Sequence, residues 1–203
     1  MIENGRDAIV DLAYFAAAIC FIIGLKFLST PNRARRGNQI AAAGMAVAIV
    51  ATFISREVSQ NYILIIVGII IGAGVSSYAS RIVKMTAMPQ MVAIFNGMGG
   101  GTAALVSVSE FSSKPDIARG EATSIVLGVL IGSISFSGSL IAFLKLQEMM
   151  SGRPITFPNQ KLYNLLIFAG IVVLGIAAIA LGDGTVSRTF VWLIFFAALL
   201  LGA

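Results

Sequence analysis

The sequence predicts an all-α fold: a polytopic transmembrane helix bundle of about seven helices. Of its 203 residues, 58% are hydrophobic and only 11% are charged, and the mean hydropathy is +0.94. A soluble domain normally carries about 25% charged residues, so this chain has too few to cover a surface that faces water. A helix crosses the hydrocarbon core with about 20 apolar residues, and apolar runs close to that length recur along the chain. The runs are continuous rather than alternating, which favours helices over the strands of a barrel.

The apolar runs can be followed in order from the N-terminus. The first, residues 9–28, follows an acidic, polar start with no basic region or cleavage site, so we expect no removed signal peptide. A basic loop separates it from the second run, residues 40–54, and the third covers 62–79. The fourth, residues 89–111, begins at Pro89, which suits the first turn of a helix. The fifth, sixth and seventh cover residues 123–143, 163–181 and 190–203.

The gaps between these runs are short and polar, and none is long enough to hold a second domain. Residues 1–203 are therefore predicted to form one transmembrane domain. The last run ends at Ala203 after 14 residues, without a polar flank. We interpret this end as a cut within a larger polypeptide; the alternative is a short or tilted final helix.

The positions of lysine and arginine predict the orientation of the chain. If the runs cross the membrane in turn, one set of alternate loops holds nine basic residues and the other holds five. Positive residues gather on the cytoplasmic side, so the N-terminus is predicted to lie outside. The inside set is Lys26, Arg33, Arg35, Arg36, Arg81, Lys84, Lys145, Arg153 and Lys161, and the outside set is Arg6, Arg56, Lys114, Arg119 and Arg188.

Composition also excludes several classes of site. The net charge of +5 comes from residues in short loops rather than from a stripe on a soluble face, so it does not indicate nucleic-acid binding. Cys20 is the only cysteine and there is no histidine. A metal site built on these residues, and a histidine that carries protons near neutral pH, are therefore not expected.

The fourth run carries an amide inside the membrane. Asn96 lies seven residues after Pro89, or about 10 Å further along a helix axis. A polar residue at this depth is by default a candidate functional residue. The alternative is that Asn96 hydrogen bonds to a neighbouring helix and serves packing alone.

Glycines and serines surround this position in sequence. Pairs of small residues four apart, such as Gly68 and Gly72 or Gly128 and Gly132, are typical of close helix packing in lipid. The residues predicted to serve helix packing are Pro89, Gly97, Gly99, Gly100, Gly101, Gly132 and Gly138. The glycine run lacks the third glycine of a dinucleotide-binding fingerprint and lies within the membrane, so it does not predict nucleotide binding.

The fifth run holds two pairs of serines spaced four apart, Ser133 with Ser137 and Ser135 with Ser139, which mark two neighbouring faces. One interpretation is that these hydroxyls donate to the carbonyls of their own helix. The other is that one face joins Asn96 and lines a polar, hydrated path. The spacing alone leaves both open.

Three segments carry a resemblance to a known family. They are VKMTAMPQMVAIFN from Val83 to Asn96, followed by glycines; GNQIAAAGMA from Gly37; and LIGSISFSGSLIAF from Leu130. In order and spacing, the chain resembles the membrane domain of the β subunit of proton-translocating NAD(P) transhydrogenase. The resemblance spans much of the chain, and the segment with Met-Pro is its most specific part.

The resemblance implies a function divided among domains. One soluble domain binds NAD(H), another binds NADP(H), and hydride passes between them while the membrane domain moves protons. This chain then resembles a fragment that lacks the NADP-binding domain, holds no cofactor itself and transfers no hydride alone. The implied partners are an α-type subunit with its own membrane helices and NAD-binding domain, a second protomer in a homodimer, and the lipid of the cell inner (cytoplasmic) membrane.

The implied proton path comprises Asn96, Thr102, Ser135 and Ser139. Some family members carry a histidine that is implicated in proton transfer at the position of Asn96. An asparagine cannot take up a proton at physiological pH, so Asn96 can hold water but cannot titrate. We therefore expect the proton acceptor to lie on a helix of another subunit.

Other functions remain as alternatives. A seven-helix retinal protein needs a lysine in the middle of its last helix, and residues 190–203 contain none. An independent secondary transporter or ion-conducting protein typically carries internal repeats and charges at the midplane, which are not evident here. A passive membrane scaffold is the third alternative.

Overall fold

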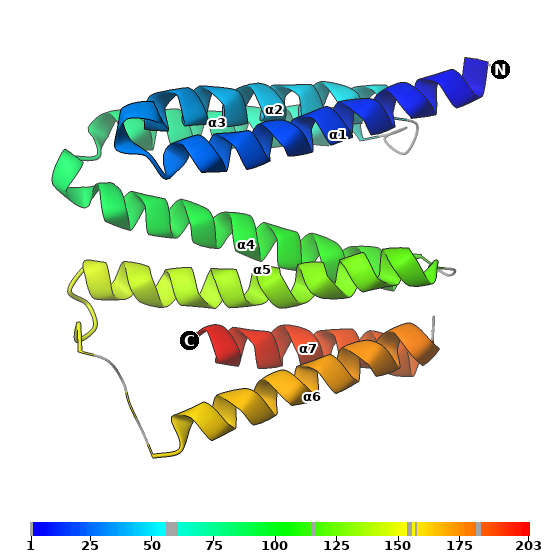
Figure 1. Ribbon diagram of the computed structural model, residues 1–203, viewed down its shortest axis with the longest axis vertical. Helices are drawn as coiled ribbons and strands as arrows, with labels where there is room; N and C mark the ends of the chain where they lie inside the picture. The colour runs from blue at the N-terminus through cyan, green and yellow to red at the C-terminus, as the bar shows by residue number, and fades with distance from the viewer. Residues whose placement is uncertain (1, 56–60, 115–116, 154–155, 157, 182–183) are drawn as a thin grey trace. The chain divides into compact units, whose positions relative to one another are not determined.

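A computed structural model confirms the predicted fold class. The structure describes residues 2–55, 61–114, 117–153, 156, 158–181 and 184–203, and these residues form seven α-helices and no strand (Figure 1). Each helix is long and apolar enough to cross a membrane. The helices are α1 (Ile2–Leu28), α2 (Ala34–Ile54), α3 (Tyr62–Ile82), α4 (Met88–Ser113), α5 (Arg119–Leu146), α6 (Gln160–Leu181) and α7 (Thr185–Gly202). Arg56, which was used to predict the orientation, lies outside the described residues.

The hydropathy pattern predicted the positions of the helices well, but it did not predict helix ends that are polar. The predicted limits at Leu28, Ile54, Tyr62 and Leu181 coincide with helix ends. The seventh helix begins at Thr185, five residues before the predicted start at residue 190. Its first turn is polar, yet the Thr189 hydroxyl donates to the backbone oxygen of Thr185 at 2.9 Å, so the side chain is satisfied within the helix. Polar groups paired in this way do not end a helix, although they lower its hydropathy.

The chain folds as two compact units, Met1–Arg81 and Ile82–Ala203. The assignment of residues 1–203 to one transmembrane domain stays a prediction. In the first unit, α1 and α2 pack closely at glycines. A Cβ at Gly37 would lie 2.7 Å from the backbone oxygen of Gly24, so only glycine allows this approach. By contrast, α3 has no buried residue, and among the described residues a Cβ at Gly68 or Gly72 would meet no atom within 4 Å beyond its own helix backbone.

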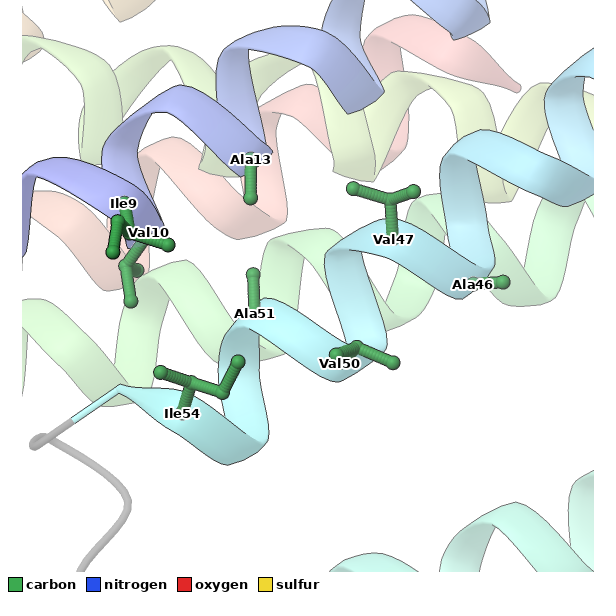
Figure 2. Close-up of a pocket in the computed structure, with 8 residues that line it drawn as sticks. All are labelled: Ile9, Val10, Ala13, Ala46, Val47, Val50, Ala51 and Ile54. Atoms are coloured by element: carbon green, nitrogen blue, oxygen red, sulfur yellow. The ribbon is translucent and has the colours of Figure 1, made fainter. Parts of the chain in front are cut away.

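The first unit also carries an apolar groove of about 290 Å³ between α1 and α2 (Figure 2). At the same end of the helix pair, the Arg6 Nε donates to the backbone oxygen of Ile54 at 2.7 Å and so caps α2. The lining residues are Ile9, Val10, Ala13, Ala46, Val47, Val50, Ala51 and Ile54. A groove of this composition is compatible with contact to hydrocarbon.

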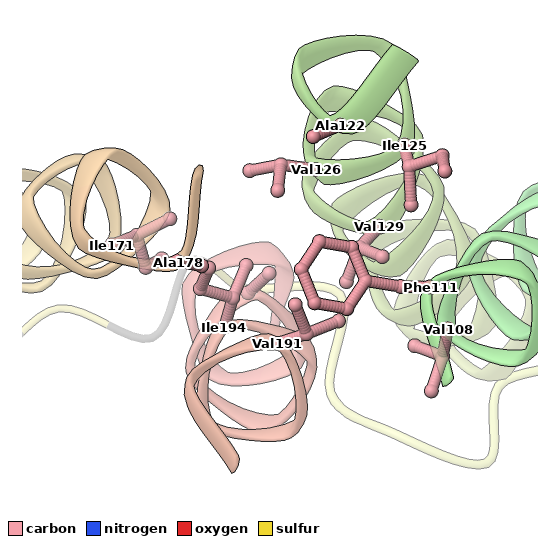
Figure 3. Packing of buried hydrophobic residues seen from close by; sticks show 11 residues of the cluster. Val108, Phe111, Ala122, Ile125, Val126, Val129, Ile171, Ala178, Val191 and Ile194 are labelled. Atoms are coloured by element: carbon pink, nitrogen blue, oxygen red, sulfur yellow. The ribbon is translucent and has the colours of Figure 1, made fainter. Parts of the chain in front are cut away.

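In the second unit, α4 lies antiparallel to α5, and α7 lies between α5 and α6 (Figure 1). Its core is a cluster of small, branched and aromatic apolar side chains from all four helices (Figure 3). Lipid is as apolar as these side chains, so the contacts hold the helices by dispersion and close fit rather than by exclusion of water. The cluster comprises Val108, Phe111, Ala122, Ile125, Val126, Val129, Ile171, Ala178, Val191, Ile194 and Ala198.

Candidate functional site: a polar cluster between α4 and α5

The start of α4 fixes the depth of the candidate site. A 3-10 turn, η2 (Met85–Ala87), leads into α4, and Pro89 lies in its first turn, as the sequence predicts. Pro has no N–H to lose at this position, and its fixed φ favours the helix. Asn96 follows about two turns later on the same helix.

Glycines bring the two helix backbones close together next to Asn96. A Cβ at Gly132 would lie 2.6 Å from the backbone oxygen of Gly100, and a Cβ at Gly100 would lie 2.9 Å from that of Gly132. A Cβ at Gly97 would lie 3.1 Å from the Cβ of Ser139, and one at Gly101 would lie 2.9 Å from the ring of Phe136. Side chains larger than hydrogen at Gly100 or Gly132 would meet backbone atoms and force α4 and α5 apart, whereas at Gly97 and Gly101 they would meet side chains.

At this contact the Asn96 amide bridges to two serines. Its Nδ2 donates to the Ser139 Oγ at 2.8 Å and to the Ser135 Oγ at 3.3 Å. An amide nitrogen carries two hydrogens, so both serines can accept at once. The serine pair that faces α4 is therefore Ser135 with Ser139, and three of the four predicted path residues meet in one cluster.

The hydrogen bonds leave the cluster able to order water. Each serine accepts from Asn96 and keeps its own hydroxyl hydrogen for another acceptor, while the Asn96 Oδ1 retains its acceptor capacity. None of the three groups titrates near neutral pH. The cluster can orient a chain of water molecules but cannot itself store a proton.

The cluster borders an open groove of about 590 Å³ on the surface formed by α4 and α5. Asn96 is exposed there in this chain, although it lies about two turns inside an apolar helix. An amide exposed to hydrocarbon would leave its carbonyl oxygen unpaired, so the groove suits a polar group from a further helix or water. Its lining residues are Met88, Pro89, Val92, Ala93, Asn96, Gly138, Ser139 and Ala142.

Three predicted residues make no hydrogen bond or close backbone contact within the cluster: Thr102, Gly99 and Gly138. The Thr102 hydroxyl donates to the backbone oxygen of Met98 in its own helix at 2.8 Å. A Cβ at Gly99 would meet no atom within 4 Å, so Gly99 makes no packing contact in the described part of the chain, unlike its neighbours. Gly138 packs on a different helix, since a Cβ there would lie 3.1 Å from the backbone oxygen of Gly202 in α7.

The second serine pair is buried away from the groove. Ser137 donates to the backbone oxygen of Ser133 at 3.0 Å, as expected for a hydroxyl in a membrane helix. Ser133 is fully buried, and its hydroxyl has no hydrogen-bond partner among the described residues. Donation to the helix's own carbonyls is therefore seen for Ser137, whereas Ser135 and Ser139 contact Asn96. That these two serines line a hydrated path stays a prediction.

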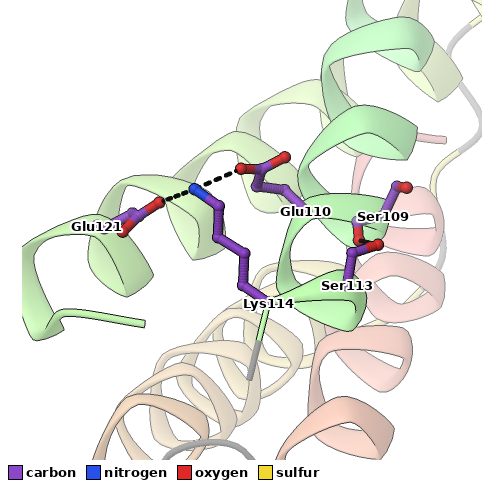
Figure 4. Close-up of polar contacts among 5 residues, drawn as sticks. All are labelled: Ser109, Glu110, Ser113, Lys114 and Glu121. Carbon is purple, nitrogen blue, oxygen red and sulfur yellow. Dashed lines mark hydrogen bonds and ion pairs between the residues drawn. The ribbon is translucent and has the colours of Figure 1, made fainter. Parts of the chain in front are cut away.

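A charged cluster joins α4 and α5 at their other end (Figure 4). The Lys114 Nζ lies 2.7 Å from a carboxylate oxygen of Glu110 and 2.5 Å from one of Glu121. The hydrogen bonds to Glu110 and Glu121 raise the pKa of Lys114 well above its usual value. These side chains are about 40% exposed, so water screens the attraction. The spacing of Glu110 and Lys114 was a signal visible in the sequence, but the role of Glu121 was not.

Two further polar contacts had no clear signal in the sequence. Gln90 on α4 donates through its Nε2 to the backbone oxygen of Leu146 on α5 at 3.0 Å. Ser187 is fully buried, and its hydroxyl donates to the backbone oxygen of Ala178 on α6 at 2.7 Å. Within the described residues, no group of histidine, cysteine, aspartate and glutamate side chains could hold a metal ion.

Comparisons with known proteins agree on one family. The family model described as NAD(P) transhydrogenase beta subunit matches residues 10–203. Two relatives from Rhodospirillum rubrum, each named NAD(P) transhydrogenase subunit beta, are 40% identical to the chain over 156 residues. The matched part covers 73% of this chain and 33% of each relative, so the chain spans about a third of the length of these relatives.

Proposed function

Because the chain belongs to the NAD(P) transhydrogenase beta subunit family, we propose that it is part of the proton-conducting membrane domain of such an enzyme. In this proposal, protons cross the membrane beside α4 and α5 while hydride passes between NADH and NADP in soluble domains outside this chain. The chain supplies no hydride-transfer chemistry of its own. Membership of the family disfavours the retinal protein and the independent transporter as alternatives.

One observation carries the proposal: an amide within a membrane helix is hydrogen bonded to two serines on a facing helix, at the edge of an open groove. Hydrogen bonds between membrane helices also serve packing, but here the bonded groups face an open groove as well as each other. Asn96 and the two serines supply donors and acceptors that hold water in hydrocarbon. Water held there gives protons a route from one side chain to the next.

The mechanism requires a titrating group beside this water. Asn96 does not take up protons in the physiological range, so it positions water for a neighbour. We place that neighbour on a helix of another subunit, next to the groove of α4 and α5. Movement of that helix, driven by the nucleotide-binding domains, would then connect the water chain to one side of the membrane at a time.

The proposal includes partners and location. The chain would assemble with an α-type subunit that contributes membrane helices and the NAD-binding domain, and two protomers would form a dimer. The NADP-binding domain would belong to the same β subunit. The complex would lie in the cell inner membrane with the N-terminus of this chain outside.

Proton movement in the complete complex tests the proposal. The complex is reconstituted in liposomes that contain a pH-sensitive dye, and NADPH and an NAD analogue are added. We expect a change of internal pH that requires both nucleotides and that falls by about tenfold or more in Asn96→Leu, since this change removes hydrogen bonds in a site without bulk water. Hydride transfer without any pH change in the wild type, or unchanged proton movement in Asn96→Leu, would contradict the proposal.

Thr102→Val completes this experiment. The Thr102 hydroxyl is bonded within its own helix, so we expect a smaller effect than in Asn96→Leu. Thr102 keeps its predicted place in the path only if proton movement falls in this variant as well. An unchanged rate would restrict the path to Asn96, Ser135 and Ser139.

A further inference from the structure

Gln90 makes a second polar contact between α4 and α5, nearer the start of α4 than Asn96. It follows Pro89 directly in the first turn of α4, and its Nε2 donates to the backbone oxygen of Leu146 at 3.0 Å. Leu146 is the last residue of α5. The bond therefore ties the beginning of one helix to the end of the other.

This bond completes the C-terminus of α5. The last four carbonyl groups of a helix have no partner within it. Three of those of α5 accept from the following backbone: Phe143 from Gln147 at 2.9 Å, Leu144 from Met149 at 3.0 Å, and Lys145 from Glu148 at 3.1 Å. The fourth, that of Leu146, accepts from Gln90. Every carbonyl in the last turn of α5 thus has a partner in this structure, and the partner of Leu146 lies on α4.

Gln90 and Asn96 connect the same two helices at matching intervals. They lie six residues apart on α4, or about 9 Å, and their partners Leu146 and Ser139 lie seven residues apart on α5, or about 10 Å. Because α4 and α5 are antiparallel, the two bonds form successive cross-links in one register. A slide of one helix along the other would break both together.

The carbonyl oxygen of Gln90 sets this residue apart from an ordinary helix cap. Its Oε1 is closed off from solvent and has no hydrogen-bond partner among the described residues. An unpaired buried acceptor is unfavourable, and a side chain that only capped α5 could leave this oxygen in water. The side chain is held where its amide reaches Leu146, despite this cost to local stability.

From these contacts we propose that Gln90 is a positioning residue for proton transfer: its bond to Leu146 sets the register in which Asn96 reaches Ser135 and Ser139. The inference rests on the proposed function. Gln90 acts through α5 and does not touch the proton or the water that carries it. Loss of its donor should uncouple proton movement from hydride transfer rather than stop hydride transfer.

The test compares four versions of the complete complex in liposomes: the wild type, Gln90→Leu, Gln90→Glu and Gln147→Leu. The quantity measured is the ratio of protons moved to hydride transferred. Gln147→Leu is the matched control, because it makes the same change at an exposed side chain one residue from Leu146. We expect the ratio to fall severalfold, up to about tenfold, in Gln90→Leu, the scale of one lost hydrogen bond. Gln147→Leu should keep the wild-type ratio.

Gln90→Glu supplies a signature that a purely structural role would not produce. A carboxyl group can donate to Leu146 only while it is protonated, and burial favours that form. The ratio in this variant should therefore approach the wild type at low pH and fall toward that of Gln90→Leu as the pH rises. Lys84, Lys145 and Glu148 are the charged residues near this contact in the sequence. The wild type carries all three, so any change of the ratio with pH that these residues cause would appear in the wild type as well.

The outcomes separate the two proposals. If Gln90→Leu matches Gln147→Leu, or Gln90→Glu shows no step with pH, while Asn96→Leu still uncouples the enzyme, the inference about Gln90 is wrong and the proposed function stands. If the wild type moves no protons, both the proposed function and the inference about Gln90 are wrong. If Gln90→Leu fails to assemble, as shown by lost hydride transfer, the change of the ratio with pH in Gln90→Glu alone tests the inference about Gln90.

Discussion

Replacing Gly132 by alanine should force α4 and α5 apart. The new Cβ would lie 2.6 Å from the backbone oxygen of Gly100 and 2.7 Å from the backbone nitrogen of Ala104. Both are backbone atoms, so neither can rotate out of the way. Ordinary contacts of a Cβ begin at 3.4 Å. The difference requires a local separation of about 0.8 Å in a closely packed interface.

That separation reaches the candidate site. The bond from Asn96 to Ser139 measures 2.8 Å, and the same displacement along its direction would lengthen it to about 3.6 Å, beyond hydrogen-bond range. Overpacking of this kind costs about 1–3 kcal/mol. Gly132→Ala should therefore lower both the thermal stability of the complex and its ratio of protons to hydride, although residue 132 carries no polar side chain.

Thermal denaturation of the detergent-solubilised complex measures the first effect, and the liposome assay measures the second. Gly99→Ala is the matched control: it makes the same change in a membrane helix where, within the described part of the chain, the new Cβ would meet no atom within 4 Å beyond its own helix backbone. We expect Gly99→Ala to leave the stability unchanged or slightly raised, because alanine favours a helix. Equal stability and equal coupling in the two variants would refute the reasoning.

Two further predictions concern contacts outside the groove. Ser187→Ala removes the buried hydroxyl that donates to Ala178 and should lower the free energy of unfolding by about 1 kcal/mol. The control is Thr189→Val, at an exposed hydroxyl bonded within its own helix, which should have less effect. Equal melting temperatures in the two variants would contradict this prediction. Lys114→Met removes the ion pairs with Glu110 and Glu121. Pairing raises the pKa of Lys114, so its contribution should be complete below about pH 10.4, the usual pKa of lysine, and should be lost as the pH rises through the higher folded value. Melting curves of the wild type and variant should therefore differ at neutral pH and converge in strongly alkaline solution, and a constant difference would count against the ion pairs.

The helices could be predicted because lipid imposes one strong rule, that long apolar runs cross it as helices. The ends were less certain where polar side chains satisfy themselves within the helix. Thr185 to Thr189 looked like a loop in composition, yet the hydroxyl of Thr189 is bonded to its own backbone. Hydropathy counts such a residue as polar and cannot register its partner.

The candidate site could be predicted only in part. Asn96 stood out as an amide in an apolar run, but Ser133–Ser137 and Ser135–Ser139 have the same spacing. The contact of Gly100 with Gly132 turns Ser135 and Ser139 toward α4, and that contact depends on how two distant segments pack. Gln90 gave no signal, because its partner is a backbone carbonyl 56 residues away.

The most direct test of the central claim asks whether the Asn96 cluster, rather than Asn96 alone, conducts protons. The complete complex is reconstituted in liposomes with its nucleotide-binding domains facing the medium, so that the liposome interior corresponds to the outside of the cell. The interior is made acidic relative to the medium, and the rate of NADP reduction by NADH is measured with and without this gradient. Ser135→Ala with Ser139→Ala removes both partners of Asn96, and Ser133→Ala with Ser137→Ala removes the same number of hydroxyls from the same helix on a face away from the groove. The account predicts that the gradient accelerates the wild type and the second double variant but hardly affects the first. Equal acceleration of the two double variants would contradict it.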